Sequence, residues 1–405
     1  MLYQNVCLEA IAHTLPEEVV TSAEIEARLE PLYTRLRLPE GRLELMTGIR
    51  ERRFWLPDVP PSEKSVETAA KALDRAGIDR GQIGALVHGS VCRDFLEPAT
   101  ACGVHHRLGL PNRAAVYDVS NACLGLLNGV VQVANMIELG QIRAGVVVGT
   151  ESGRTLVEST IAHLNADTSL SRQDIKTAFA SLTIGSGSAA IVLCDRELSR
   201  TGNRLVGGVM QTATEHCELC QGGSGQSAVG SWQSAVGNGQ SAVGSGQSAV
   251  GSVGGAGGVG DNLPSPFGRG AGGEGGEGAV AAAASVSPPL LMATDSEALM
   301  REGVAVAQTA FAAFLEEMQW QPRDIQKTFC HQVGRAHHRL LFESLGIDQR
   351  IDFSTFEYLG NTGAAALPTA ASLGIESGHV HSGDRVGLFG IGSGINVIML
   401  GLEWA

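Results

Sequence analysis

Short apolar runs alternate along the chain with longer segments whose apolar residues recur at helical spacing. Uninterrupted runs are typical of strands buried on both faces, and a spacing of three and four residues is typical of helices with one buried face. The pattern predicts strands at 146–148, 189–193 and 386–389, and helices at 62–76, 124–139 and 297–318. Because strands and helices alternate, we expect an α/β fold with covered sheets.

One segment, 222–289, lacks this pattern. The pentapeptide Gln-Ser-Ala-Val-Gly recurs in it at positions 226, 233, 240 and 247, and a Gly-, Glu- and Ala-rich stretch follows. A seven-residue period could indicate a coiled coil, but a glycine in every repeat, and a second in two of the four, argues against a stable helix. We therefore expect a disordered, low-complexity insertion between segments 1–221 and 290–405.

Length and charge narrow the class of protein. The 405 residues allow two or three domains at roughly 150 residues each. A net charge of −13 argues against non-specific binding to nucleic acid or anionic lipid. No apolar run approaches the roughly 18 residues of a membrane span, and the N-terminus lacks the pattern of a signal peptide. We expect a cytoplasmic protein whose eight cysteines are reduced.

Cys123 is the first candidate nucleophile. A strand-like run from Tyr117 leads into Ser120 and Asn121, which favour helix starts, and a helix of small and apolar residues follows. Cys123 is therefore predicted in the first helical turn, where free N–H groups and the helix dipole favour a thiolate. The alternative is a buried structural cysteine.

His331 and Asn361 could complete a catalytic site. His331 follows an apolar strand, and Asn361 lies in a glycine-flanked turn. A histidine can take a proton from a thiol or polarise a thioester carbonyl, and an asparagine can orient the histidine or donate to an oxyanion. Either residue alone is usually a satisfied polar group, but the three together point to acyl-transfer chemistry.

These segments resemble the thiolase superfamily, and within it the ketoacyl-acyl-carrier-protein synthase III group. The resemblance covers nearly the whole chain outside 222–289, and the 30 residues between His331 and Asn361 suit this group. The matching segments are the nucleophile motif 121–125, the histidine motif 331–334, the asparagine motif 360–365, the N-terminal signature 47–53 and the glycine turn 390–394.

The resemblance implies a thiolase-like five-layer αβαβα fold with two similar halves. These would be 1–205 and 206–405, the second interrupted by 222–289. It also implies a homodimer that takes acyl-CoA or acyl-carrier protein as substrate and needs no cofactor. The backbone amides of Cys123 and Ser393 would form the oxyanion hole.

A finer resemblance is to the branch that begins head-to-head olefin biosynthesis by condensing two long acyl-CoA molecules. That branch uses a glutamate about 26 residues before the cysteine as a base that reaches across the dimer, and Glu97 has this position relative to Cys123. Burial could raise the pKa of such a carboxylate enough for it to take an α-proton. The alternative is an acid near a helix start, since Pro98 suits the first helical position.

The expected reaction is a Claisen condensation through an acyl group held on Cys123. Deprotonation by Glu97, or decarboxylation of a malonyl unit as in fatty-acid initiation, would generate the carbanion, and His331 and Asn361 would stabilise its enolate form. Two departures from the synthase III pattern matter. Gly334 replaces an asparagine, and the tryptophan often found before Thr47 is absent, so the residues that bind the CoA nucleotide stay unassigned. A thioester hydrolase, a simple acyl transferase and a non-catalytic scaffold remain alternatives.

Three further signals are weaker. Cys217 and Cys220 form a Cys-x-x-Cys pair without the second pair that structural zinc needs, so we expect no metal. Gly185–Ala190 matches a loose dinucleotide pattern but precedes a strand instead of opening a helix. His337 and His338, with Arg335 and Arg339, would form either a solvated helical face or a basic patch for a phosphate.

Overall fold

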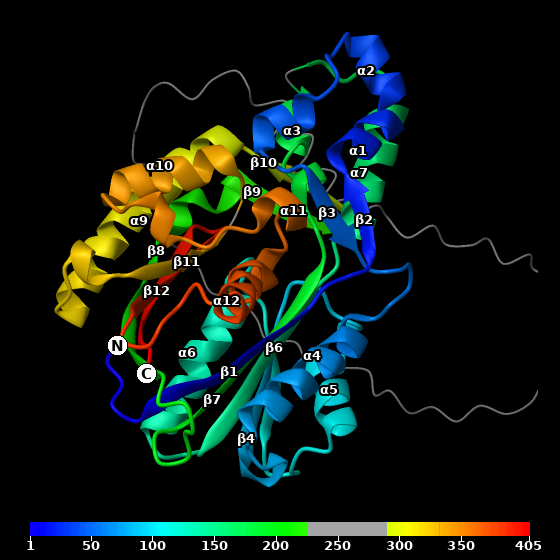
Figure 1. Cartoon of the computed structure of the whole chain (residues 1–405). Coiled ribbons are helices and arrows are strands. Elements are labelled where there is room, and N and C mark those ends of the chain that lie inside the picture. Colours follow the sequence, from blue (N-terminus) through cyan, green and yellow to red (C-terminus); the bar gives the residue numbers. More distant parts are fainter. Residues whose placement is uncertain (173, 225–289, 332) are drawn as a thin grey trace, which may run out of the picture.

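The computed structural model describes residues 1–172, 174–224, 290–331 and 333–405, which build one mixed sheet of nine strands (Figure 1). The strand order is β11-β12-β13-β8-β1-β7-β6-β4-β5. The two halves of the sheet meet where β1 (Val6–Thr14) pairs with β8 (Arg204–Thr212). The expected division after residue 205 therefore falls inside the first strand of the second half.

The two halves repeat one strand order. In the first, β1 pairs antiparallel with β7, which is followed outward by β6, β4 and β5. In the second, β8 pairs antiparallel with β13, which is followed outward by β12, β11 and a bridge from Thr328 to Asp352. This repeat confirms two similar halves. The remaining strands are β4 (Ile83–Gly89), β5 (Ala115–Val119), β6 (Ala144–Glu151), β7 (Gly187–Asp195), β11 (Lys327–Cys330), β12 (Arg385–Gly392) and β13 (Asn396–Glu403).

Helices cover both faces of each half (Figure 1). The outer face of the first half carries α4 (Pro61–Ala76) and α5 (Thr100–Leu108), and that of the second carries α9 (Ser296–Met318) and α10 (Arg335–Leu345). Between the half-sheets lie α6 (Gly125–Glu138) and α12 (Ala366–Glu376). The result is the five-layer αβαβα arrangement that the sequence predicts.

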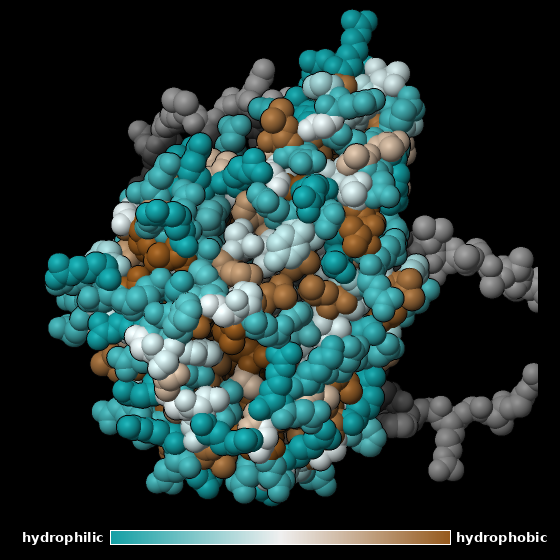
Figure 2. All heavy atoms as spheres, in the orientation of Figure 1, coloured by the Kyte–Doolittle hydropathy of each residue, from teal (hydrophilic) through white to brown (hydrophobic). Residues whose placement is uncertain are grey.

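The surface of the molecule is mainly hydrophilic on the face shown in Figure 2, and its apolar side chains form scattered groups. The chain has 42 acidic and 29 basic residues, so the protein is acidic overall. Several large apolar side chains nevertheless face solvent in the loop between β4 and α5, which also carries Glu97: Val91, Phe95 and Leu96 are 56%, 65% and 96% exposed.

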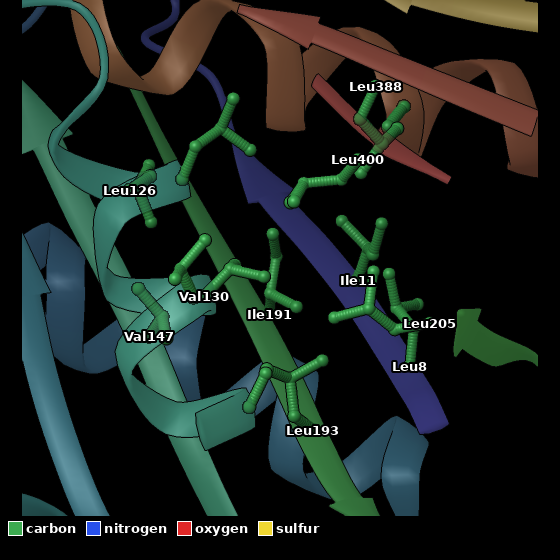
Figure 3. Close-up of a cluster of buried hydrophobic side chains, with 14 of the residues drawn as sticks. Leu8, Ile11, Leu126, Val130, Val147, Ile191, Leu193, Leu205, Leu388 and Leu400 are labelled. Carbon is green, nitrogen blue, oxygen red and sulfur yellow. The ribbon is translucent and has the colours of Figure 1, made fainter. Parts of the chain in front are cut away.

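The central core joins the two halves (Figure 3). Leu8, Ile11 and Ile191 of the first half pack in the same cluster as Leu388 and Leu400 of the second, with α6 contributing Leu126 and Val130. Burial of such side chains stabilises each by roughly 1.5–3 kcal/mol. The predicted strands at 146–148, 189–193 and 386–389 lie in β6, β7 and β12, and the three predicted helices correspond to α4, α6 and α9.

Helix α9 departs from one expectation. Among the described residues it is the one helix long and apolar enough to cross a membrane by length and composition, whereas the sequence pattern suggested no such run. Its buried face, which includes Gly303, Ala307, Phe311 and Phe314, packs against β8 and β13. This packing accounts for its apolar residues, as in the core helices of many globular proteins.

A smaller lobe projects from one end of the sheets (Figure 1). Its helices share one apolar core, and the Glu26 carboxylate accepts hydrogen bonds from the N–H groups of Gly41 (2.7 Å) and Leu43 (2.6 Å). Glu26 thereby fixes the start of α3, whose other end contacts the first residue of α10. The lobe contains β2 (Glu18–Thr21), α1 (Ser22–Arg28), α2 (Glu30–Leu36), α3 (Arg42–Thr47), β3 (Glu51–Phe54) and α7 (Arg154–Ala166), with α11 (Phe356–Leu359) beside β3.

The low-complexity segment joins a two-stranded ribbon. Strand β9 (Cys220–Ser224) pairs antiparallel with β10 (Leu290–Thr294), so the boundary expected at residue 222 falls inside a strand. Residues 225–289, which hold all four pentapeptide repeats, lie outside the described residues.

A pH-dependent loss of stability is expected from His88 on β4. This side chain is fully buried against Ser65, and burial lowers the pKa of His88 to about 4, below its ordinary value of 6.5. The unfolded chain therefore binds a proton at pH 5 that the native state does not, so stability falls as the pH drops below about 6.5. Between pH 7 and pH 5 the loss through His88 should be about 2 kcal/mol.

Guanidinium unfolding of the wild type and of His88→Gln at both pH values measures this effect. The other buried histidines titrate in both proteins, so the difference between their pH dependences isolates His88. Identical pH dependences in the two proteins would contradict the assignment.

Candidate active site

Cys123 lies in a tight turn between β5 and α6. Helix α6 begins at Gly125, so Cys123 precedes the helix and is not in its first turn as predicted. Ala122 adopts a left-handed conformation with φ of 45°. The side-chain amide of Asn121 donates to Asn128 Oδ1 (2.8 Å) on α6, and Asn121 Oδ1 accepts from Asn396 Nδ2 (3.3 Å) on β13. Asn121 thus ties the nucleophile turn to both halves.

Three glycines let α6 begin directly against the sheet. An ideal β-carbon on Gly125 would lie 2.9 Å from the carbonyl carbon of Gly89, and one on Gly149 would lie 2.4 Å from the Gly89 oxygen. β-Carbons do not approach other atoms so closely, and α6 could not occupy this position with larger residues. The position of Cys123 therefore depends on backbone-to-backbone packing.

The thiol of Cys123 is held in its neutral form. Burial, with smaller contributions from the nearby Cys220 and Glu151, raises the pKa of Cys123 to about 12. The expected thiolate at a helix start is therefore wrong for the resting protein, because Cys123 precedes the helix and desolvation dominates.

Ser393 lies in the turn that joins β12 to β13. This turn packs against the nucleophile: an ideal β-carbon on Gly392 would lie 3.6 Å from the Cys123 nitrogen. The carbonyl oxygen of Ser393 accepts from Asn396 Nδ2 (2.9 Å), the same side chain that bonds Asn121. The two segments expected to supply the oxyanion donors are thus adjacent.

His331 directly follows β11 and is buried, with 5% of its surface exposed. Its backbone N–H donates to the Phe389 oxygen (2.9 Å) on β12. Burial, with a smaller contribution from His337, lowers the pKa of His331 to about 3. The ring is therefore neutral at physiological pH, and within the described part of the chain its Nδ1 has no hydrogen-bond partner.

Asn361 is held by its backbone in a turn after α11. Its N–H donates to the Thr183 oxygen (3.0 Å), its carbonyl oxygen accepts from the Gly185 nitrogen (2.9 Å), and its side-chain Oδ1 accepts from the Gly363 nitrogen (3.0 Å). Thr183 and Gly185 belong to the first half of the chain. Asn361 is thus a residue of the second half fixed by the backbone of the first.

Shared neighbours bring these residues to one end of the sheets. The backbone N–H of His331 donates a hydrogen bond to strand β12, which ends beside Cys123. The turn after Asn361 packs against Glu151, whose charge raises the pKa of the Cys123 thiol. Among the described residues, no side-chain hydrogen bond joins Cys123, His331 and Asn361 to one another.

Glu97 is separate from this group. It lies exposed in the loop between β4 and α5, so the burial that a basic carboxylate needs is not supplied by its own chain. The loop borders a hollow of about 470 Å³ whose lining includes Val91, Phe95, Leu96 and Ser120, the residue that begins the nucleophile turn. Glu97 thus lies on a loop next to the nucleophile turn but at the surface.

Sequence reasoning missed Glu151, the last residue of β6. It is 6% exposed, and burial raises its pKa. The sequence feature that could have identified it is an acidic residue at the end of a mainly apolar strand, because the carboxyl ends of such strands meet at one edge of the sheet.

The weaker signals have structural explanations. Cys220 contacts Thr294 through its sulfur (3.4 Å), and the described residues contain no group of three or more side chains able to hold a metal ion. The segment Gly185–Ala190 runs into β7 and opens no helix. On α10, His338 is paired with Asp352 (2.8 Å), and burial lowers the pKa of His337 to about 4, whereas Arg335 and Arg339 are exposed, so only the arginines have the exposure that a solvated or basic face needs.

Replacing Gly125 by alanine should damage activity more than folding. The added carbon clashes with Gly89 and must displace the nucleophile turn, which should slow acylation of Cys123 by at least about tenfold and destabilise the protein by about 1–3 kcal/mol. Acylation is followed by intact mass after mixing with acyl-CoA.

Gly103→Ala is the matched control. Gly103 lies inside α5, and an added β-carbon there would meet nothing closer than 3.8 Å. This variant should be acylated at the wild-type rate. Wild-type acylation of Gly125→Ala as well would show that the close approach does not position Cys123.

Two sequence families match the chain. The thiolase N-terminal domain matches residues 44–181, and the C-terminal domain of 3-oxoacyl-[acyl-carrier-protein] synthase III matches 315–404. Proteins named acyl-CoA:acyl-CoA alkyltransferase are similar over their full length: the one from Shewanella oneidensis is 36% identical and the one from Xanthomonas campestris 32% identical, each with complete coverage of both chains.

Solved structures agree. Structures of Xanthomonas campestris OleA superpose over 100% of this chain with TM-scores of 0.80 and 0.81 at 31% identity, covering 98–100% of the OleA chains, and one holds lauric acid and lauroyl-CoA. A 3-oxoacyl-carrier-protein synthase III from Xanthomonas oryzae superposes over all of both chains with a TM-score of 0.80 at 31% identity. The chain therefore has a thiolase fold and belongs to the acyl-CoA:acyl-CoA alkyltransferase family of acyltransferases.

Proposed function

We propose that the protein condenses two fatty acyl-CoA molecules, head to head and without decarboxylation, to give a β-keto acid. The observation that carries this proposal is the full-length similarity to proteins named acyl-CoA:acyl-CoA alkyltransferase. The solved OleA variants include substitutions of a glutamate and of a cysteine that follows it by 26 residues, the separation of Glu97 and Cys123 here. This agreement supports the same roles for the two residues.

The first step is acyl transfer to Cys123. The sulfur attacks the thioester carbonyl, its proton passes to the departing CoA sulfur, and the chain keeps the acyl group as a new thioester. The backbone N–H groups of Cys123 and Ser393 would stabilise the oxyanion, each such donor being worth about 3 kcal/mol of barrier. A thiol with a pKa of about 12 suits this order, because its proton leaves only as the bond to carbon forms.

The second step forms the carbon–carbon bond. Glu97 removes the α-proton of a second acyl-CoA, and the resulting enolate oxygen accepts hydrogen bonds from His331 and Asn361. The neutral ring of His331 retains an N–H to donate. The α-carbon attacks the acyl group on Cys123 and expels the thiolate. Hydrolysis of the remaining CoA thioester then gives the β-keto acid.

We also propose a homodimer in which Glu97 acts on the partner subunit. The exposed side chains of Phe95 and Leu96 flank Glu97, and β5 is a half-buried edge strand close to the nucleophile turn. Exposed apolar loops and unpaired edge strands favour association. A partner packed on this surface would bury Glu97, which the proposed base needs.

The remaining parts of the proposal concern cofactor and location. Thioester exchange and proton transfer need no redox group, so acyl-CoA enters as substrate and no resident cofactor is required. We expect a cytoplasmic enzyme, and the net charge of −13 argues against nucleic-acid partners. It also weakly favours acyl-CoA over acyl-carrier protein as donor, because carrier proteins are themselves acidic.

Product analysis with myristoyl-CoA alone, and then with added malonyl-carrier protein, tests the reaction. We expect acylated Cys123 and a β-keto acid from myristoyl-CoA alone. Glu97→Ala should keep the acylation and lose the product, whereas Cys123→Ala should lose both. Product that forms only with malonyl-carrier protein would instead assign a synthase III role, and free CoA without product a thioester hydrolase.

Mixed dimers test the role of Glu97 across the interface. When Cys123→Ala and Glu97→Ala chains are co-expressed, each mixed dimer should contain one complete site, which restores about one quarter of the wild-type activity for random pairing. Tagging the two chains differently allows the mixed dimer to be purified and assayed. A purified mixed dimer without activity would exclude action of Glu97 on the partner subunit.

A further inference from the structure

Glu151 is a buried acid at the point where three segments of the proposed site meet. It ends β6, and β7 presents only Gly187 opposite it. Its Oε1 accepts a hydrogen bond from the backbone nitrogen of Val91 (3.1 Å), which begins the loop that carries Glu97. With 6% of its surface exposed, Glu151 contributes nothing to the solubility of the protein.

The second segment is the turn that follows Asn361. An ideal β-carbon on Gly363 would lie 3.2 Å from Cγ of Glu151, so the Glu151 side chain packs directly on the Gly363 backbone. The nitrogen of Gly363 in turn bonds Oδ1 of Asn361. The third segment is the nucleophile turn, because Cys123 lies close enough for the charge of Glu151 to act on its thiol.

We propose that Glu151 is a positioning residue that holds the Glu97 loop against the Asn361 turn beside Cys123. The proposal deepens the condensation reaction and rests on it for its catalytic consequence. Its structural part concerns the order of residues 91–98 and stands on the contacts of Glu151 alone.

The surroundings of Glu151 favour the neutral carboxyl. Burial raises its pKa, and among the described residues only hydrogen bonds from Val91, Cys92 and Ser90 oppose this effect. Arg154, three residues later, is paired with Glu18 and Glu158. No cation of the described residues therefore compensates a charge on Glu151.

The titratable groups that face Glu151 are both thiols. Cys92 comes from the loop after β4 and Cys123 from the turn before α6, whereas the turn at Gly363 and strand β7 present no titratable side chain. An ionised Glu151 would repel the thiolate that Cys123 becomes when condensation expels it. The neutral form avoids this repulsion and can donate as well as accept a hydrogen bond.

The backbone of Glu151 is held independently of its carboxyl. The indole N–H of Trp55 donates to the Glu151 carbonyl oxygen (3.0 Å), and β6 pairs on both sides. Substitutions of the side chain should therefore leave the strand in place. Glu151→Gln keeps the size and both hydrogen-bonding functions of the neutral acid, whereas Glu151→Ala removes them.

Hydrogen exchange measured by mass spectrometry tests the positioning. Peptides that cover residues 91–98 should exchange faster in Glu151→Ala than in the wild type, whereas Glu151→Gln should match the wild type. Glu197→Gln, which changes an exposed carboxylate on the surface, is the matched control and should change nothing. Equal exchange in Glu151→Ala and the wild type would overturn the positioning role whatever reaction the protein catalyses.

Infrared difference spectra and pH–rate profiles test the protonation state. Difference spectra of wild type minus Glu151→Gln over a pH series should show the Glu151 carboxyl losing its proton at a higher pH than an exposed glutamate, and loss at the same pH would contradict the effect of burial. In single-turnover assays, Glu151→Ala should slow condensation by at least about tenfold, with acylation of Cys123 within about threefold of wild type. Glu151→Gln should retain the neutral-pH rate and lose any alkaline decline that the wild type shows.

These outcomes separate the two proposals. A wild type that takes up the acyl group but forms no β-keto acid defeats the condensation, while exchange of residues 91–98 still decides the positioning role. The wild type could instead condense acyl groups with the same pH profile as Glu151→Gln, while Glu151→Ala condenses them at the wild-type rate. That result would contradict only the role of Glu151.

Discussion

The close approach of Gly89, Gly125 and Gly149 is the contact on which the rest of the site depends. Each β-carbon that these residues lack would fall within 2.4–2.9 Å of neighbouring backbone, so α6 begins against the ends of β4 and β6 with no side chain between them. This packing sets where the chain must turn before the helix, and Cys123 occupies that turn. A larger residue at any of the three positions would move the nucleophile relative to every group that acts on it.

Residues of both halves of the molecule hold the site in place. Asn121 bonds both α6 and Asn396 of β13, and Asn361 is fixed by the backbone of Thr183 and Gly185. Because each half supports functional residues of the other, neither half presents the proposed site alone. The central core, in which Leu388 and Leu400 pack with Leu8 and Ile191, makes this arrangement rigid (Figure 3).

Burial shifts the ionisation of Cys123, Glu151 and His331 toward their uncharged forms. It raises the pKa of Cys123 and Glu151 and lowers the pKa of His331. Desolvated surroundings of this kind disfavour charge on these three groups at rest, whereas Glu97 is exposed. Preorganised N–H donors are worth most in such surroundings, because no water or counter-ion competes with the developing oxyanion.

The sequence by itself determined the fold class and the family resemblance, and it proposed the Cys, His and Asn set. The apolar runs of strands and the helical spacing of apolar residues can be recognised in the sequence, because each element buries one of its own faces whichever elements surround it. The motif spacing likewise reflects local turns: Asn361 lies in its glycine turn and His331 at the end of β11, as the sequence predicts.

The tertiary structure alone decided the electrostatics and the relation between segments. Cys123 looked like a helix-start thiolate, yet desolvation by residues distant in sequence outweighs the helix dipole. In the sequence, Glu151 is only the end of a predicted strand. The packing of Val91 and Gly363 around it shows that Glu151 contacts both the Glu97 loop and the Asn361 turn. Burial and proximity depend on contacts between segments far apart along the chain, and a local pattern of residues does not contain them.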